Sequence, residues 1–180
     1  MRQQKLKWVD QEQIEELILN EKTGFLGLST EDIPYVVPLN YVWYKEAIYF
    51  HGAEEGKKMD IIRVNKNACF TVCRELGTMT NPIPAKTDTA YKSVMVFGDL
   101  QIVEDLSEAH AAMQAILNKY VPGYYHTPLS KTHVEKYQSS LGSKTSVIKI
   151  IAKEITAKEN HYDEAVSFYP GRSINMDIGN

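Results

Sequence analysis

The sequence predicts an α+β domain whose centre is an antiparallel barrel or sandwich of six strands. Most apolar segments are short, rich in β-branched and aromatic residues, and bounded by turn residues, which favours strands joined by hairpins. The 180 residues, 43% of them hydrophobic, suffice for one domain with a substantial core. We expect this domain to span 1–160. A polar tail over 161–180 should be loosely structured or pack on a partner subunit.

The first elements are an amphipathic helix and two strands. Asp10 can cap a helix over about 11–21, because Gln13 completes a capping box and apolar residues follow at helical spacing. A strand at 24–30 precedes a second strand at 35–44 that is apolar on both faces. Pro38 interrupts this second strand and cannot donate a ladder hydrogen bond, which predicts a bulge or a sheet edge.

The middle of the chain predicts a hairpin and a long loop. A third strand at 47–52 places His51 on one face, and a short helix over about 56–65 follows it. A fourth strand at 67–73 leads into 75–89, a segment with two prolines and no periodicity that is typical of a loop.

The last elements are two strands and two helices. The fifth strand, 90–105, contains Gly98, which marks a bend or bulge. Helices are expected at 107–120 and about 130–140. The alternating segment 145–159 is the final strand.

Bulk charge and hydropathy exclude several classes of protein. The formal net charge of −3 argues against nonspecific nucleic-acid binding. No apolar run approaches the roughly 20 residues that span a bilayer, and the N-terminal segment lacks the apolar centre of a secretory signal. We therefore expect a cytoplasmic protein with no nucleic-acid or membrane partner.

Common catalytic and metal-binding signatures are missing. The segment 52–58 resembles a P-loop, but three residues separate its glycines and Lys58 stands where a hydroxyl would hold magnesium. No GxGxxG follows a strand, and there is no GxSxG elbow. The five histidines are scattered without metal-ligand spacing, so we predict no metal site.

One segment does indicate a binding site. The hairpin 35–58 delivers Lys57 and Lys58 to the start of a helix, where backbone N–H groups and two ammonium groups could balance a phosphate monoester. The alternative is that both lysines are solvated charges on a surface helix. Glu54 and Glu55 favour that alternative unless they point away.

Four segments in order, VPLNYVWY, AIYFHGAEEGKK, NACFTV and YKSVMVFG, resemble the flavin-binding split-barrel superfamily of pyridoxamine 5'-phosphate oxidase. Within it, the chain is most similar to the nitroimidazole-resistance, or flavin-nucleotide-binding, branch. The resemblance covers roughly 24–105. It implies an antiparallel six-stranded split β-barrel with flanking helices, and an FMN-binding homodimer with the cofactor in a cleft between subunits.

The resemblance also implies which residues hold FMN. Lys57 and Lys58 match the basic pair that grips the phosphate, although the family usually has Arg-Lys there, and lysine lacks the bidentate fork of arginine. Ser93 departs from the glutamine of the oxidases. The implied cofactor-binding residues are Pro38, Leu39, Asn40 and Tyr41 along the ring, His51, Gly52 and Ala53 beside the ring and ribityl chain, Lys57 and Lys58 at the phosphate, and Lys92 and Ser93 on the fifth strand.

The implied activity is that of an FMN-dependent oxidoreductase. It would take hydride from NAD(P)H and reduce a small acceptor such as a nitroimidazole, with His51 as a candidate proton donor. An arginine-rich C-terminal substrate signature is missing, which argues against pyridoxamine phosphate oxidation. The alternatives are a non-catalytic protein that binds flavin, haem or a deazaflavin, and a dimer that has lost its cofactor. For His51 the alternative is a hydrogen bond to the cofactor or to a buried backbone group.

Overall fold

A computed structural model of the chain describes residues 4–138 and 142–178. The strands are β1 (Thr23–Thr30), β2 (Ile33–Asn40), β3 (Val42–Tyr44), β4 (Ala47–Ala53), β5 (Asn67–Met79), β6 (Asp88–Ile102) and β7 (Thr145–Asn160). The helices are α1 (Gln11–Asn20), α2 (Lys57–Val64), α3 (Leu106–Tyr120), α4 (Lys131–Glu135) and α5 (Ile174–Ile178), with 3₁₀ turns η1 (Gln4–Leu6), η2 (Pro84–Lys86) and η3 (Glu164–Val166). Part of the helix expected at 130–140, namely 139 and 140, lies outside the described residues.

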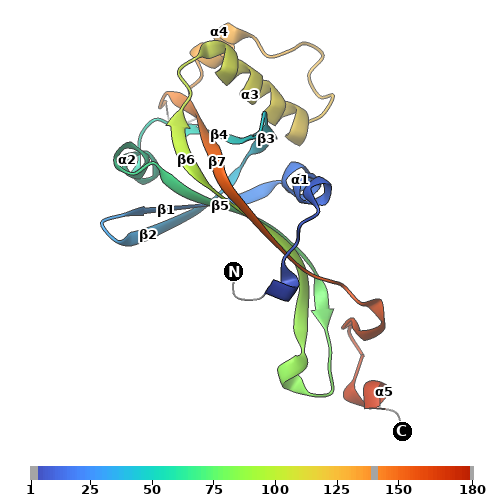
Figure 1. Ribbon diagram of the computed structural model, residues 1–180. Helices are drawn as coiled ribbons and strands as arrows, with labels where there is room; N and C mark the ends of the chain where they lie inside the picture. Colours follow the sequence, from blue (N-terminus) through green and yellow to red (C-terminus); the bar gives the residue numbers. More distant parts are fainter. Residues whose placement is uncertain (1–3, 139–141, 179–180) are drawn as a thin grey trace.

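The described strands form one antiparallel sheet in the order β2-β1-β5-β6-β7-β4-β3. The sheet curls into a half-barrel with helices against it, as Figure 1 shows, and this shape is consistent with a split barrel. The predicted α+β class is confirmed. The predicted number of strands is wrong, because seven strands form within the described residues instead of six.

The extra strand arises because the expected strand at 35–44 divides at Tyr41. Before it, Asn40 of β2 pairs with Thr23 of β1, and after it Val42 of β3 pairs with Tyr49 of β4. These partners lie near opposite ends of the sheet order, so no single ladder could hold both halves. Tyr41 itself is fully buried, and its hydroxyl donates to the carbonyl oxygen of Ile18 at 2.7 Å.

Two sequence expectations about sheet irregularities are confirmed. Pro38 lies in the edge strand β2, opposite Phe25 in an uninterrupted register, so the missing N–H disturbs no ladder. The register of β6 against β7 shifts between Phe97 and Gly98, which is the expected bulge. A Cβ on Gly98 would overlap the carbonyl oxygen of Ile151, so only glycine fits.

The expected loop at 75–89 is shorter than predicted, because both of its ends belong to strands. Strand β5 continues to Met79, and β6 begins at Asp88. The two strands project from the barrel as a two-stranded arm whose turn contains η2 (Figure 1). The described tail packs on this arm, since the N–H of Phe168 donates to the carbonyl of Thr78 at 2.8 Å. Packing of the tail on a partner subunit stays a prediction.

Two apolar clusters hold the elements together. The larger one fills the barrel between α1, α2 and the sheet, with Phe50, Phe70 and Ile150 fully buried. The smaller one lies between α3 and the far face of β3, β4 and β7, and includes Tyr49 and Met113. No helix within the described residues is long and apolar enough to cross a membrane.

Candidate functional site

A basic corner forms where α2 begins. Gly56 precedes the helix with φ 98°, a left-handed conformation that glycine tolerates, and no side chain of the described residues caps the first turn. The ammonium of Lys57 lies 5.5 Å from the centre of the Tyr35 ring on β2. That of Lys58 lies 5.5 Å from the centre of the Phe50 ring on β4. The corner therefore joins the edge of the sheet to the strand that precedes α2.

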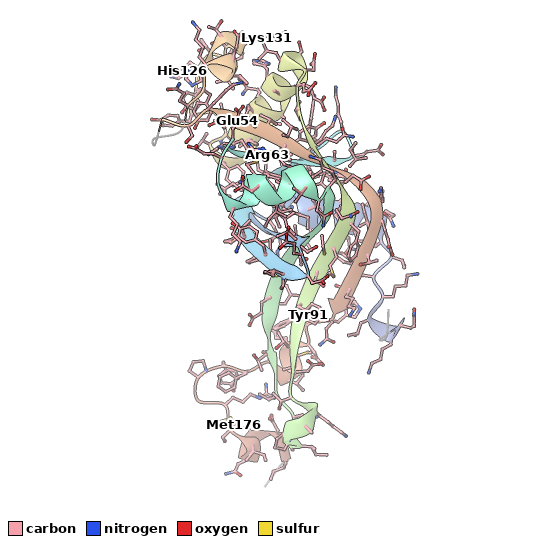
Figure 2. The ribbon with its side chains drawn as sticks, turned by 90° about the vertical axis from the view of Figure 1, so that its left-hand side faces the viewer. Glu54, Arg63, Tyr91, His126, Lys131 and Met176 are labelled. Atoms are coloured by element: carbon pink, nitrogen blue, oxygen red, sulfur yellow. The ribbon has the colours of Figure 1, made fainter. Side chains whose placement is uncertain are left out.

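The two glutamates before this helix turn away from it. The Oε1 atom of Glu54 accepts hydrogen bonds from Ser146 Oγ at 2.8 Å and lies 3.4 Å from Lys144 Nζ. Glu55 accepts from the hydroxyl of Ser143. Figure 2 shows Glu54 beside α2, close to Arg63, whose guanidinium donates to the Glu54 carbonyl oxygen. The acidic side chains are thus directed to the start of β7, and the corner stays positive.

Neither lysine of the corner forms an ion pair with a carboxylate among the described residues. Lys58 is partly buried, and a Cβ built on Gly52 would lie 2.5 Å from its Nζ atom. Burial lowers the pKa of Lys58, because the charged ammonium has lost hydration without gaining a counter-charge. A partly buried cation without an anion is a favourable place for a phosphate.

His51 lies on the other face of β4. Successive residues of a strand point to opposite faces, so Gly52 and Phe50 face the barrel while His51 and Tyr49 face α3 and α4. The His51 ring meets the Tyr137 ring edge-on, with 6.1 Å between their centres. Burial, and secondarily the Lys58 charge, lowers the pKa of His51.

The Nδ1 atom of His51 is buried and has no hydrogen-bond partner among the described residues. A buried polar atom without a partner destabilises a protein by about 1–3 kcal/mol, so such atoms are rare in native structures. A hydrogen-bonding group outside the described residues would satisfy it.

The remaining predicted residues fall into two sets. On β2, Pro38 and Asn40 are exposed and Leu39 packs against the barrel core. Tyr41 lies inside that core, with its hydroxyl committed to Ile18. Ala53 ends β4 as the partner of Thr145.

Lys92 and Ser93 lie apart from the basic corner. Lys92 Nζ lies 3.2 Å from Glu159 Oε1 and donates to Gln13 Oε1 at 3.0 Å, beside α1. Ser93 points to the opposite face of β6, level with Cys73 on β5. The described chain therefore brings together Lys57, Lys58, Gly52 and His51, and leaves Lys92 and Ser93 elsewhere.

Sequence reasoning missed the aromatic side chains of this site. Tyr35 and Phe50 support the lysines, and Tyr137 lies against His51. Alternation along 35–37 and 47–52 places the first two on defined faces, which was an available signal. Nothing local in the sequence places Tyr137, because it lies in an irregular segment after α4, far from His51 along the chain.

The curled antiparallel half-barrel and its helices define the split-barrel class of α+β proteins. The family model described as pyridoxamine 5'-phosphate oxidase matches residues 10–159, and the chain belongs to this family. A comparison with curated protein sequences gave no match.

Solved structures agree with this fold. A candidate 5-nitroimidazole antibiotic resistance protein from Bacteroides thetaiotaomicron is 26% identical, with a TM-score of 0.68 over 85% of this chain and 86% of that one. A flavocytochrome from Azotobacter vinelandii is 19% identical, with a TM-score of 0.75 over 92% of this chain and 76% of that one. An FAD-binding protein from Mesorhizobium loti is 18% identical, with a TM-score of 0.58 over 85% and 96%. The last two show the fold alone.

Proposed function

We propose that this chain binds FMN, with the phosphate at the basic corner. The observation that carries the proposal is the pair Lys57 and Lys58, which have no carboxylate partner among the described residues while Glu54 and Glu55 turn away. A phosphate dianion would pair with both ammonium groups and with the uncapped N–H groups of α2. Family membership supports a flavin nucleotide as the molecule that carries this phosphate.

The rest of the flavin would extend from this corner along β4 and the edge strand. The missing side chain of Gly52 lets Lys58 lie against β4, and Ala53 adds little bulk, so the ribityl chain could pass the end of β4 closely. The exposed Pro38 and Asn40 of β2 are available to the ring. We propose the site without Lys92, because its charge is already paired with Glu159.

We propose that the flavin serves an NAD(P)H-dependent reduction of a small acceptor in the cytoplasm, such as a nitroimidazole. The similarity at 26% identity to a candidate nitroimidazole-resistance protein supports this acceptor class. A bound flavin would supply the hydride chemistry, while the chain binds it, orients it and excludes water. We propose His51, whose Nδ1 has no hydrogen-bond partner among the described residues, as the group that holds or delivers a proton.

We further propose that two copies complete the cleft. The outer face of β1 and β6 carries three large apolar side chains, Phe25, Met95 and Phe97, which are 36–40% exposed. They lie on one face, because Phe25 and Met95 both pair with Thr71 on β5 between them. A second copy would cover this face, and exposed apolar patches of this kind mark association sites.

A non-catalytic role is the second candidate, and the electrostatics of His51 favour it. The lowered pKa keeps the imidazole neutral near pH 7, and a neutral imidazole is a poorer acid but a good hydrogen-bond partner or haem ligand. The chain would then store or sense flavin, or bind haem or a deazaflavin in the same cleft.

The phosphate assignment is tested by comparing FMN with riboflavin, which lacks the phosphate. Quenching of flavin fluorescence should show that the wild-type protein binds FMN more tightly than riboflavin. The Lys57→Ala/Lys58→Ala double variant should lose at least about 100-fold in FMN affinity, because two charge-assisted contacts are removed. Its riboflavin affinity should be nearly unchanged.

The matched control is Lys66→Ala/Lys86→Ala, which removes the same charge from two exposed positions. It should bind FMN like the wild type. Equal FMN affinity in the Lys57/Lys58 variant and the control would contradict the phosphate site. Separately, anaerobic oxidation of NADH or NADPH, with and without 2-methyl-5-nitroimidazole, tests catalysis; no turnover at full FMN occupancy would leave the binding role.

A further inference from the structure

The helical layer contains a pocket on the side of the molecule away from the barrel core. It has a volume of about 450 Å³, within the range of roughly 300–1,000 Å³ that is usual for small-molecule sites. Its floor is formed by α3, and its walls by the segment 121–130 and by α4. We call it the α3–α4 pocket. Its described lining residues are Met113, Leu117, Tyr125, Thr127, Pro128, Leu129, Ser130, His133, Val134 and Tyr137.

Side chains of α3 hold this pocket in shape. His110 Nε2 donates to the Leu129 carbonyl oxygen at 2.5 Å, and the Leu129 N–H donates to Gln114 Oε1 at 2.7 Å. Lys131 Nζ donates to Ser107 Oγ at 2.8 Å. Positions 107, 110 and 114 share one helix face, so three bonds fix the wall along two turns. The cavity is therefore a built feature and not a gap under a loose loop.

The lining chemistry defines what the pocket can bind. Among the described residues that line it, none is Asp, Glu, Lys or Arg, so a charged molecule would lose its hydration without a counter-charge. Flat rings stand at one wall: His133 stacks on Tyr137 with 5.9 Å between ring centres and 29° between planes. The hydroxyl of Thr127 and the ring nitrogens of His133 are exposed at this wall and are polar groups that a guest could reach.

We propose that the α3–α4 pocket binds a small, uncharged aromatic molecule of one or two rings. The ring would lie on the Met113 and Leu117 floor beside the stacked His133 and Tyr137. A polar substituent would find Thr127 or His133 at the wall. This inference goes beyond the flavin site, because it concerns a cavity on the other side of β4 and needs no flavin to be bound.

The position of the pocket gives the inference a structural consequence. Tyr137 contacts His51 edge-on and His133 face-on. One ring therefore separates the pocket from His51, whose Nδ1 has no partner among the described residues. An aromatic guest would therefore lie one side chain away from His51.

The test is methyl NMR on flavin-free protein labelled at the methionine methyl groups, titrated with indole. An aromatic ring bound in the pocket should shift the Met113 methyl signal saturably, and the Met113→Leu variant identifies that signal. Met176 is the internal control, because it lies in the tail at the end of the molecule opposite α4, as Figure 2 shows for Met176 and Lys131. Its signal should not move.

Variants sharpen the assignment. Leu117→Trp fills the pocket and should weaken indole binding at least tenfold, about 1.4 kcal/mol. Leu19→Trp makes the same change at a 44% exposed position on α1 and should bind indole like the wild type. His133→Ala removes the stacked ring without adding bulk and should also weaken indole binding. It provides the test if Leu117→Trp fails to fold.

Two results would overturn the proposal. One is a Met113 signal that does not move with indole, or that moves in the Leu117→Trp and His133→Ala variants at the same indole concentrations as in the wild type. The other is indole-3-carboxylate binding as tightly as indole, which would contradict the requirement for an uncharged guest. A fivefold or greater preference for indole supports it.

Discussion

The two faces of strand β4 carry opposite chemistry. On the barrel face, Lys58 lies against Gly52 and Phe50, with no carboxylate partner among the described residues. On the other face, His51 meets Tyr137 in an aromatic layer that contains an uncharged pocket. A strand of seven residues delivers both environments because its side chains alternate. One step along a strand therefore separates a charged surface from an aromatic one.

Of the three single substitutions that compare the two faces, Gly52→Ala, on the charged face, should have the largest effect. The new Cβ would stand 2.5 Å from Lys58 Nζ, and the end of a lysine side chain can move away. The protein should therefore fold, but its ammonium would leave the phosphate corner. FMN affinity should fall about tenfold, as for the loss of one charge-assisted hydrogen bond. The ratio of FMN to riboflavin affinity measures this loss.

The same variant tests whether the two faces are independent. Indole binding, followed at Met113, should be unchanged in Gly52→Ala. A loss of indole binding equal to the loss of FMN affinity would show that the faces are coupled and that the separation is wrong.

The charged face could be predicted from the sequence in large part. A hairpin leading into a helix that opens with Lys57 and Lys58 is a local pattern, and local patterns determine hairpins and helix starts. The orientation of Glu54 could not be predicted, because its partner Ser146 lies 92 residues away. The division of 35–44 at Tyr41 could not be predicted for the same reason. It depends on which strands pair with each half, and the alternation of residues does not show those partners.

The next effect belongs to the aromatic face. Tyr137→Leu removes a ring that contacts both His51 and His133. Ring pairs contribute about 0.5–1.5 kcal/mol each beyond their buried area, so the loss of two pairs should lower the free energy of unfolding by roughly 1–3 kcal/mol. Indole affinity should also fall, while the ratio of FMN to riboflavin affinity should stay the same. Urea unfolding measures the first quantity.

Tyr124→Leu is the matched control, because Tyr124 is 72% exposed and contacts the ring of Tyr125 at the surface. We expect it to change stability by less than about 0.5 kcal/mol. An equal loss in both variants would mean that the contacts of Tyr137 contribute nothing particular to the fold.

The aromatic face was the part least accessible to sequence reasoning. The expected helix at 130–140 is short in the structure, with α4 ending at Glu135, and Tyr137 follows it in an irregular segment. Its position is set by the N–H of Thr145, which donates to the Tyr137 carbonyl oxygen at 3.1 Å and ties this segment to the start of β7. Such a contact has no periodic signature. The pocket could be found only once α3, the segment 121–130 and α4 were placed together.

The smallest effect concerns His51, on the aromatic face of β4. Its pKa is lowered in the folded protein, chiefly by burial and then by Lys58. The unfolded chain therefore binds a proton more readily than the folded one, and stability is lost as pH falls through the ordinary histidine range. Between about pH 7.5 and pH 5, the wild type should lose more stability than His51→Gln, which cannot take up that proton. His126→Gln, at an exposed loop position, should follow the wild-type profile in urea unfolding. If His51→Gln also followed it, the imidazole would be in contact with water, and neither its neutral state nor its unpartnered Nδ1 could support a role in binding.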